Sequence, residues 1–332
     1  MSGALRLLWA LGLGVAALPG ADTTTLVGRA MGTGWTVKLS VGPASLNRKE
    51  VTRNVSERLE QLEQLFSTYR PDSALSRFNR ATESGWVAVA PEVVAVAQAS
   101  RRISELTAGA FDVTVLPLLE LWGFGPNGGI GTVPSAPAIA RIRARVDWRQ
   151  LEVRVVPPAL RKGRTDLTAD FSSMAKGFAA DEVSRLLRDL GLTRHLVQVG
   201  GDVKAAGDDW PVAIERPLED RSELEGVVTL NGDALSTSGD YRNFFRVGTR
   251  RYGHIIDPRT GEPAHHALAA VSVIDPSCAR SSALATALFV LGPDDGWRLA
   301  QREGLAVLFF VRAGDGFERR VTPEFERRLR RR

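Results

Sequence analysis

The chain has 332 residues, of which 44% are hydrophobic and 24% are charged, proportions that are ordinary for a globular protein with a sizeable core. Its formal net charge is +5, but no basic patch is interleaved with aromatic residues, so nucleic acid is not expected as a partner. Cys278 is the only cysteine, which excludes an internal disulfide and leaves stability to the core.

The first 21 residues differ from the rest. Arg6 precedes the apolar run L-L-W-A-L-G-L-G-V-A-A-L, which is followed by Pro19, Gly20 and Ala21. The run is shorter than the roughly 20 residues that a membrane-spanning helix needs, and its pattern is typical of a secretory signal. A signal cleavage site prefers small residues where Pro19 would lie, so an uncleaved anchor stays open. We therefore expect an exported protein, either periplasmic or held at the outer face of the inner membrane.

Hydrophobic periodicity predicts the elements that follow, in chain order. Strands are expected at 24–40, 86–89, 151–156, 195–199, 211–214, 226–230, 243–247, 270–274 and 305–311. Helices are expected at 47–66, 91–107, 138–145, 176–190, 281–291 and 293–303, with polar loops at 67–79 and 126–137. Since strands and helices are mixed without strict βαβ alternation, the predicted class is α+β. No linker divides the chain, so one module is expected at 26–325, followed by a basic tail at 326–332.

Six short segments place glycine beside a carboxylate, hydroxyl or lysine at the end of a predicted element. They are M-G-T at 31–33, A-F-D at 110–112, A-K-G at 175–177, G-G-D at 200–202, S-G-D at 238–240 and H-I-I-D-P-R-T-G at 254–261. Six such segments indicate a large polar ligand that lies across loop ends. Lys176 is predicted to begin a helix, where a cation opposes the helix dipole unless a phosphate lies beside it. Neither the Rossmann nor the P-loop glycine motif is present.

His254 lies in the least ordinary stretch of the chain, residues 236–261. It comes just before a buried pair of isoleucines, where an imidazole that titrates near neutral pH could accept a proton. The alternative for this stretch alone is a hairpin turn with a capping Asp and a surface His. The other segments favour the chemical interpretation.

Together these segments resemble the FAD:protein FMN transferase family, the ApbE-like flavin transferases. The matching runs include F-S-T-Y-R-P-D-S-A-L-S-R-F-N, D-F-S-S-M-A-K-G-F-A-A-D, V-G-G-D-V, S-T-S-G-D-Y, H-I-I-D-P-R-T-G-E-P and S-S-A-L-A-T-A-L-F-V-L-G. They cover nearly all of the chain after residue 27. The resemblance implies an α+β protein related to the T-fold that binds FAD and uses Mg²⁺. FMN would be transferred to a threonine of a target protein, an exported or membrane-bound redox subunit, and AMP would leave.

The resemblance also implies residue roles. His254 would be the base that activates the target threonine. Lys176 and Asp181 would belong to the flavin nucleotide site. The residues that line this site would be Met31, Tyr69, Asp112, Ser238 and Asp240. Gly200 and Gly201 would allow close approach of the backbone, and Asp257 and Thr260 would hold the histidine loop in place. Three alternatives stay open, since Tyr69 and Phe111 could be plain core aromatics and Asp181 could be merely exposed on its helix. His195 and Cys278 are expected to be structural.

One departure concerns the metal. The family has an Asp four residues before a Thr on the buried helix, and here Ser282 stands four residues before Thr286. A backbone carbonyl near Ser173 completes the implied ligands. Because Mg²⁺ usually takes at least one protein carboxylate, weak Mg²⁺ binding and slow FMN transfer are expected. If another residue supplies the missing carboxylate, Asp275 is the first candidate. A non-catalytic FAD-binding or flavin-donating accessory protein of a respiratory system, or an FAD pyrophosphate hydrolase, therefore stays open.

Overall fold

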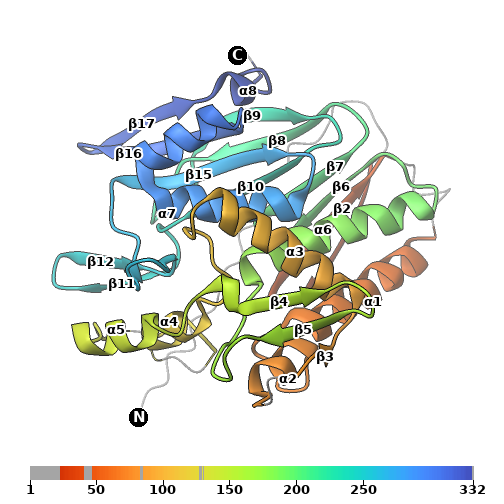
Figure 1. The fold of residues 1–332 in the computed structure, drawn as a ribbon. Coiled ribbons are helices and arrows are strands. Elements are labelled where there is room, and N and C mark those ends of the chain that lie inside the picture. The colour runs from red at the N-terminus through yellow and green to blue at the C-terminus, as the bar shows by residue number, and fades with distance from the viewer. Residues whose placement is uncertain (1–22, 41–46, 83–84, 127–128, 130, 331–332) are drawn as a thin grey trace, which may run out of the picture.

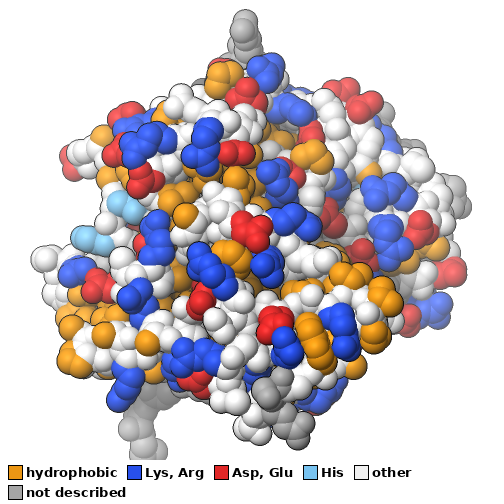
Figure 2. Space-filling model, in the orientation of Figure 1, with side chains coloured by type: hydrophobic (Ala, Val, Ile, Leu, Met, Phe, Trp, Pro, Cys, Tyr) orange, Lys and Arg blue, Asp and Glu red, His pale blue; other side chains and the backbone are white. Residues whose placement is uncertain are grey.

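The computed structural model describes residues 23–40, 47–82, 85–126, 129 and 131–330. The predicted signal or anchor lies outside these residues. Within the described part of the chain, no helix is both long enough and apolar enough to cross a membrane. Lys and Arg side chains are interspersed with Asp and Glu over the face drawn in Figure 2.

An eight-stranded antiparallel sheet organises the fold (Figure 1), with strand order β1-β2-β6-β7-β10-β15-β16-β17. The strands are β1 (Thr24–Ala30), β2 (Thr33–Leu39), β6 (His195–Val199), β7 (Asp202–Ala206), β10 (Ala234–Gly239), β15 (Leu268–Asp275), β16 (Ala306–Ala313) and β17 (Gly316–Val321). Every neighbouring pair is antiparallel. The predicted strand at 24–40 is thus a hairpin, turned at Met31 and Gly32.

Both faces of the central strands are buried, which explains their continuous apolar runs. In β16, Val307 and Phe309 face the helical layer, whereas Leu308 and Phe310 face a second core on the opposite side. That second core is closed by the two-stranded sheet of β8 (Trp210–Glu215) and β9 (Leu224–Leu230) and by α8 (Pro323–Glu326). Side chains alternate across a strand, so burial on two faces removes the usual polar alternation.

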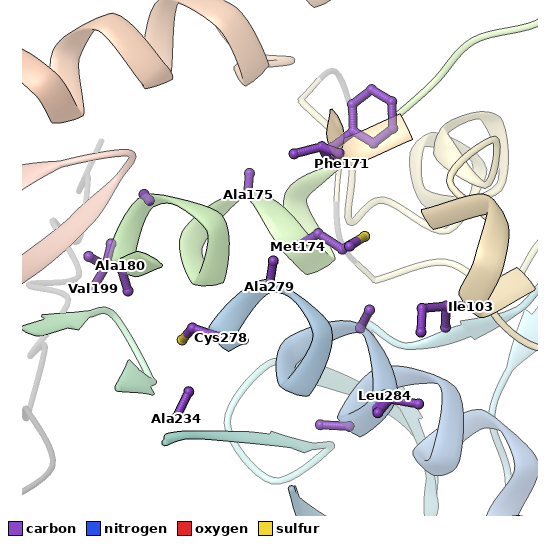
Figure 3. Packing of buried hydrophobic residues seen from close by; sticks show 14 of the residues in the cluster. Ile103, Phe171, Met174, Ala175, Ala180, Val199, Ala234, Cys278, Ala279 and Leu284 are labelled. Carbon is purple, nitrogen blue, oxygen red and sulfur yellow. The ribbon is translucent and has the colours of Figure 1, made fainter. Parts of the chain in front are cut away.

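The helical layer covers the other face of the sheet. Its helices are α1 (Arg48–Phe66), α2 (Ala74–Arg80), α3 (Pro91–Leu106), α6 (Ser172–Asp189) and α7 (Cys278–Arg302). Helices α6 and α7 pack closely, with Ala279 of α7 pointing toward α6 (Figure 3) and Gly177 of α6 lying against the start of the α7 backbone. Helix α7 is interrupted at Gly292, whose φ of 80° and ψ of −176° are not helical. The two predicted helices at 281–291 and 293–303 correspond to the segments on either side of this glycine.

Two smaller units complete the fold. A three-stranded sheet contains β3 (Val87–Ala88), β4 (Leu151–Arg154) and β5 (Ala159–Lys162), with a 3₁₀ turn at Trp148–Gln150 beside it. A third apolar cluster joins α4 (Leu116–Leu121) and α5 (Ala136–Arg143) to the β11 (Phe244–Val247) and β12 (Arg250–Gly253) hairpin and to the short β13 (Ile256–Asp257), which pairs with β14 (Glu262–Pro263). This cluster supports the histidine loop.

The α+β class is confirmed, but two local predictions are wrong. Helix α6 begins at Ser172, so Lys176 lies in its second turn rather than at its first residue. The predicted polar loop at 67–79 contains most of α2, whose N-cap Ser73 accepts a hydrogen bond from the Ser76 amide. Helix α6 starts with two serines that carry no hydrophobic periodicity, and α2 is only seven residues long, with Leu75 and Phe78 as its buried apolar residues.

Candidate functional site

A cleft of about 600 Å³ is lined by residues from loops and from the ends of several helices and strands. Its volume is in the range of small-molecule sites. All six glycine-bearing segments contribute to its wall, and so do the start of α6, the end of β10 and the buried face of α7. The prediction that a single ligand site would gather these segments therefore matches the observed arrangement.

Ten of the predicted site residues line the cleft and five do not. Those that line it are Met31, Tyr69, Asp112, Ser173, Lys176, Gly201, Ser238, His254, Ser282 and Thr286. Those outside its wall are Asp181, Gly200, Asp240, Asp257 and Thr260. Asp202, Asp170 and Tyr241 line the cleft although sequence analysis did not assign them a role.

His254 is held with one ring nitrogen occupied and the other available. Its Nδ1 lies 3.1 Å from the backbone carbonyl oxygen of Asn243. Because a carbonyl only accepts, Nδ1 carries the proton, and Nε2 of the neutral ring is an acceptor. Burial lowers the pKa of His254, and the Asn243 hydrogen bond acts against this change. The ring is therefore neutral at pH 7 and able to take a proton from a ligand in the cleft.

The loop after His254 is fastened by its own polar residues. The Asp257 carboxylate accepts hydrogen bonds from the backbone amide of Arg259 at 2.8 Å and from its guanidinium at 2.9 and 2.8 Å. Thr260 Oγ1 donates to the Asp257 carbonyl at 3.4 Å, and Gly261 closes the turn at a φ of 80°. Asp257 and Thr260 thus have contacts that suit the predicted role of holding the loop, not of touching the ligand.

Lys176 brings a cation into a cleft that also contains buried carboxylates. Burial raises the pKa of Asp170 and of Asp202, and in both the Lys176 ammonium acts against that rise. Gly200 has a φ of 59°, and a Cβ there would lie 3.3 Å from the Lys176 Cδ. Glycine at this position therefore gives room to the lysine side chain, which differs from the predicted close approach to a ligand.

Hydroxyl groups from α7 and β10 gather beside Asp202. Ser282 Oγ donates to Asp202 Oδ2 at 3.2 Å, and Ser238 Oγ lies 3.1 Å from Thr286 Oγ1. Thr286 Oγ1 also lies 3.2 Å from the Ser282 carbonyl, one turn earlier. Among the described residues, no group of three or more His, Cys, Asp or Glu side chains is placed to hold a metal ion. Any cation site here would depend on hydroxyl and carbonyl oxygens as well as a carboxylate.

Asp275, the expected substitute for the missing carboxylate, is used elsewhere. It pairs with Arg280 and accepts a hydrogen bond from the Ser277 amide at 3.0 Å, so it fixes the first turn of α7. It does not line the cleft. The expectation that Asp275 supplies the charge is therefore not supported by its position.

Asp181 and Asp240 also have partners outside the cleft. The Asp181 carboxylate accepts from the Cys278 amide at 3.0 Å, the Ala279 amide at 3.1 Å and the Ser277 hydroxyl at 3.0 Å, and so satisfies the start of α7. Asp240 pairs with Arg312 at the end of β10. The implied places of Asp181 and Asp240 in the nucleotide site do not match these contacts. Neither does the alternative that Asp181 is merely exposed.

The remaining predicted groups divide between the cleft wall and the core. Tyr69 is 71% exposed at the cleft rim, which excludes a core aromatic, whereas Phe111 is buried in the main core and also borders the cleft. Asp112 accepts from Thr114 and from the Trp148 amide, and its burial raises its pKa to about 6. Buried His195 is structural, as expected.

Comparison with known proteins places this geometry in a family. A model of the ApbE family matches residues 31–309. The chain is 37% identical over 316 residues to the FAD:protein FMN transferase of Klebsiella pneumoniae (strain 342), covering 93% of this chain and 90% of that protein. It is 36% identical over 312 residues to the enzyme of the same name from Escherichia coli (strain K12), covering 92% and 89%.

Solved structures agree with the sequence matches. The flavin transferase ApbE from Vibrio cholerae superposes with a TM-score of 0.85 at 36% identity, covering 93% of this chain and all of that one. The Pseudomonas stutzeri flavinyl transferase ApbE, in its apo form, also gives 0.85, at 39% identity, covering 93% of this chain and 97% of that one.

Proposed function

This chain belongs to the ApbE family, and on that premise we propose that it is an FAD:protein FMN transferase, which moves FMN from FAD to a target protein. The observation that carries the proposal is the cleft itself. It combines a basic histidine nitrogen with a lysine ammonium and a group of hydroxyls, all at the meeting point of the six segments. Phosphoryl transfer depends mainly on such positioning and on charge neutralisation.

The finer proposal is that the acceptor is a threonine hydroxyl and that AMP leaves. The threonine oxygen would form a bond to the FMN phosphorus while the bond from that phosphorus to the bridging oxygen of the pyrophosphate breaks, so that AMP leaves with the bridging oxygen. His254 Nε2 would take the hydroxyl proton, since Nδ1 is already engaged with Asn243. Lys176 would hold the phosphates electrostatically from the second turn of α6, near the end of the helix that itself attracts anions.

A divalent cation fits the donor atoms at the α7 side of the cleft. Mg²⁺ takes hard oxygen ligands, and the hydroxyls of Ser282 and Thr286 lie beside a carboxylate there, with Ser173 on the same wall. When bound, Mg²⁺ would neutralise charge that develops on the pyrophosphate. We further propose that the protein is exported through residues 1–21 and that the target is an exported or membrane-bound redox subunit.

The test is to incubate the mature protein with FAD, Mg²⁺ and an acceptor domain that carries the threonine, and to detect covalent flavin by in-gel fluorescence. We expect a fluorescent acceptor band from the wild type that is lost with a chelator. His254→Ala should slow labelling by about 10² or more, whereas His266→Gln, a change outside the cleft, should not.

Other outcomes separate the alternatives. FAD that is split to FMN and AMP without labelling of the acceptor would indicate a hydrolase. FAD that is bound but neither split nor transferred would indicate an accessory flavin-binding protein, the function that the loss of a carboxylate at Ser282 favours. Failure to bind FAD would refute the proposed function altogether.

A further inference from the structure

Asp202 is a buried carboxylate that faces the position where the family's metal-binding carboxylate is missing. We propose that Asp202 replaces it: the carboxylate that holds the divalent cation comes from the start of β7 in this chain, rather than from α7 at Ser282. The inference rests on the proposed function, because it concerns the same cation.

The geometry places the two positions within one hydrogen bond. Asp202 follows Gly200-Gly201 at the first residue of β7, and Ser282 lies in the second turn of α7. Ser282 Oγ and Asp202 Oδ2 are 3.2 Å apart, although the residues are 80 positions apart in the chain. A carboxylate oxygen of Asp202 thus lies close to the place that an aspartate side chain at position 282 would occupy. Both residues line the cleft.

The surrounding oxygens fit a cation beside Asp202. Thr286 Oγ1 is one helical turn from Ser282 and lies 3.1 Å from Ser238 Oγ, so several hydroxyls converge on the same part of the wall. Magnesium is usually bound by one or two protein carboxylates together with hydroxyl, water and phosphate oxygens. One carboxylate with adjacent hydroxyls therefore meets that requirement without any acid on α7.

Burial of the Asp202 carboxylate calls for a positively charged partner. Asp202 is only 5% exposed, and burying a charged group without compensation is costly. The groups that face it are the hydroxyls of Ser236 and Ser282, the Lys176 ammonium and the Asp181 carboxylate. The competing explanation is therefore that Asp202 serves only as a counter-ion to Lys176. That explanation predicts no effect of Asp202 on metal binding.

The other acids near the cleft have different partners. Asp170 Oδ1 accepts from the Ser172 amide at 2.7 Å. Both oxygens of Asp112 are occupied, Oδ1 by Thr114 and Oδ2 by the Trp148 amide. Neither forms a hydrogen bond with an α7 hydroxyl, as Asp202 does. Asp202 is therefore the carboxylate best placed to share a cation with Ser282 and Thr286.

The experiment measures the affinity for Mn²⁺, a spectroscopic substitute for Mg²⁺. The electron paramagnetic resonance signal of unbound Mn²⁺ is recorded in the presence of protein and FAD, without an acceptor. We expect Asp202→Asn, which keeps the side-chain shape, to weaken Mn²⁺ binding by about tenfold or more. A double variant, Asp202→Ala with Ser282→Asp, moves the carboxylate to α7 and should recover most of the lost affinity. Asp275→Asn, the matched acid at the start of α7, should bind Mn²⁺ like the wild type.

FAD affinity measured in a chelator distinguishes the possible failures. Asp202→Asn should bind FAD within about threefold of the wild type when no metal is present, because its role is in metal binding. Equal Mn²⁺ affinity in the wild type and Asp202→Asn would overturn the inference while leaving the proposed function standing. Loss of metal-free FAD binding in Asp202→Asn would also overturn it, in favour of the counter-ion explanation. A wild type that binds no FAD would instead refute the proposed function.

Discussion

The protonation of His195 should make stability depend on pH. The side chain is 0% exposed, and its ring is placed between two partners: Nδ1 lies 2.6 Å from the Leu192 carbonyl oxygen and Nε2 lies 2.8 Å from Ser184 Oγ. Because a carbonyl only accepts, Nδ1 donates, and Nε2 of the neutral ring accepts from the Ser184 hydroxyl. Burial lowers the pKa from its ordinary value of 6.5 to about 4, and the nearby charges of Arg188 and Lys204 add to the effect.

The sign and size follow from proton linkage. Between the two pKa values the unfolded chain binds the proton and the folded chain does not, so the free energy of unfolding falls as pH falls. At about pH 5 the histidine is mostly protonated in the unfolded chain and mostly neutral in the folded one. The free energy of unfolding is therefore about 2 kcal/mol lower at pH 5 than at pH 7.5. The contribution is fully present above about pH 7 and is lost as pH falls from there towards 4.

The assay is urea unfolding of the wild type and of His195→Asn at about pH 7.5 and pH 5. Asparagine can still donate to Leu192 but cannot gain a proton. Any constant cost of the substitution, and the titration of other buried groups such as Asp112, cancel in the double difference. The wild type should lose about 2 kcal/mol more than His195→Asn between the two pH values. Equal losses would refute the reasoning.

Three further predictions concern the helices and the base. A methyl group at Gly177 would lie 2.7 Å from a backbone carbonyl carbon of α7, so Gly177→Ala should lower the free energy of unfolding by about 2 kcal/mol or more. A methyl group at Gly85 would meet nothing within 4 Å, so the control Gly85→Ala should change it by no more than about 0.5 kcal/mol in the same urea titration. Asp181→Ala removes the acceptor for two amides at the start of α7 and should lose about 2 kcal/mol; an unchanged midpoint would contradict the capping role. Burial lowers the pKa of His254, so the transfer rate should rise with pH only in the acidic range, below the ordinary pKa of histidine, and should be constant above about pH 7. A transfer rate that still rises above about pH 7 would exclude His254 as the base.

Elements with strong local patterns could be predicted from the sequence. The boundaries of α1 follow from its apolar spacing and from Asn47, whose side chain accepts a hydrogen bond from the Glu50 amide as an N-cap. The sequence predicts a start of α6 at Lys176 because Ser172 and Ser173 carry no periodic signal, although Met174 is fully buried. Tertiary packing decides that turn, and a local pattern cannot show it.

The site was predictable as a set of segments but not as a set of contacts. Asp181 belongs to a matching motif, yet its carboxylate is satisfied by amides nearly a hundred residues later in the chain. In the sequence, Asp202 is only part of a glycine turn, because its contact with Ser282 exists only after β7 and α7 pack together. Residue types at element ends thus indicated the cleft, whereas the role of each acid depended on its long-range partners.

The most direct test of the central claim is the stoichiometry of the reaction. Mass spectrometry of the acceptor after incubation with the protein, FAD and Mg²⁺ should show one FMN joined through phosphate to a threonine, with one AMP released for each acceptor modified. An acceptor in which that threonine is replaced by alanine should remain unmodified. AMP release without modification of the threonine, or flavin attached without AMP release, would contradict the account.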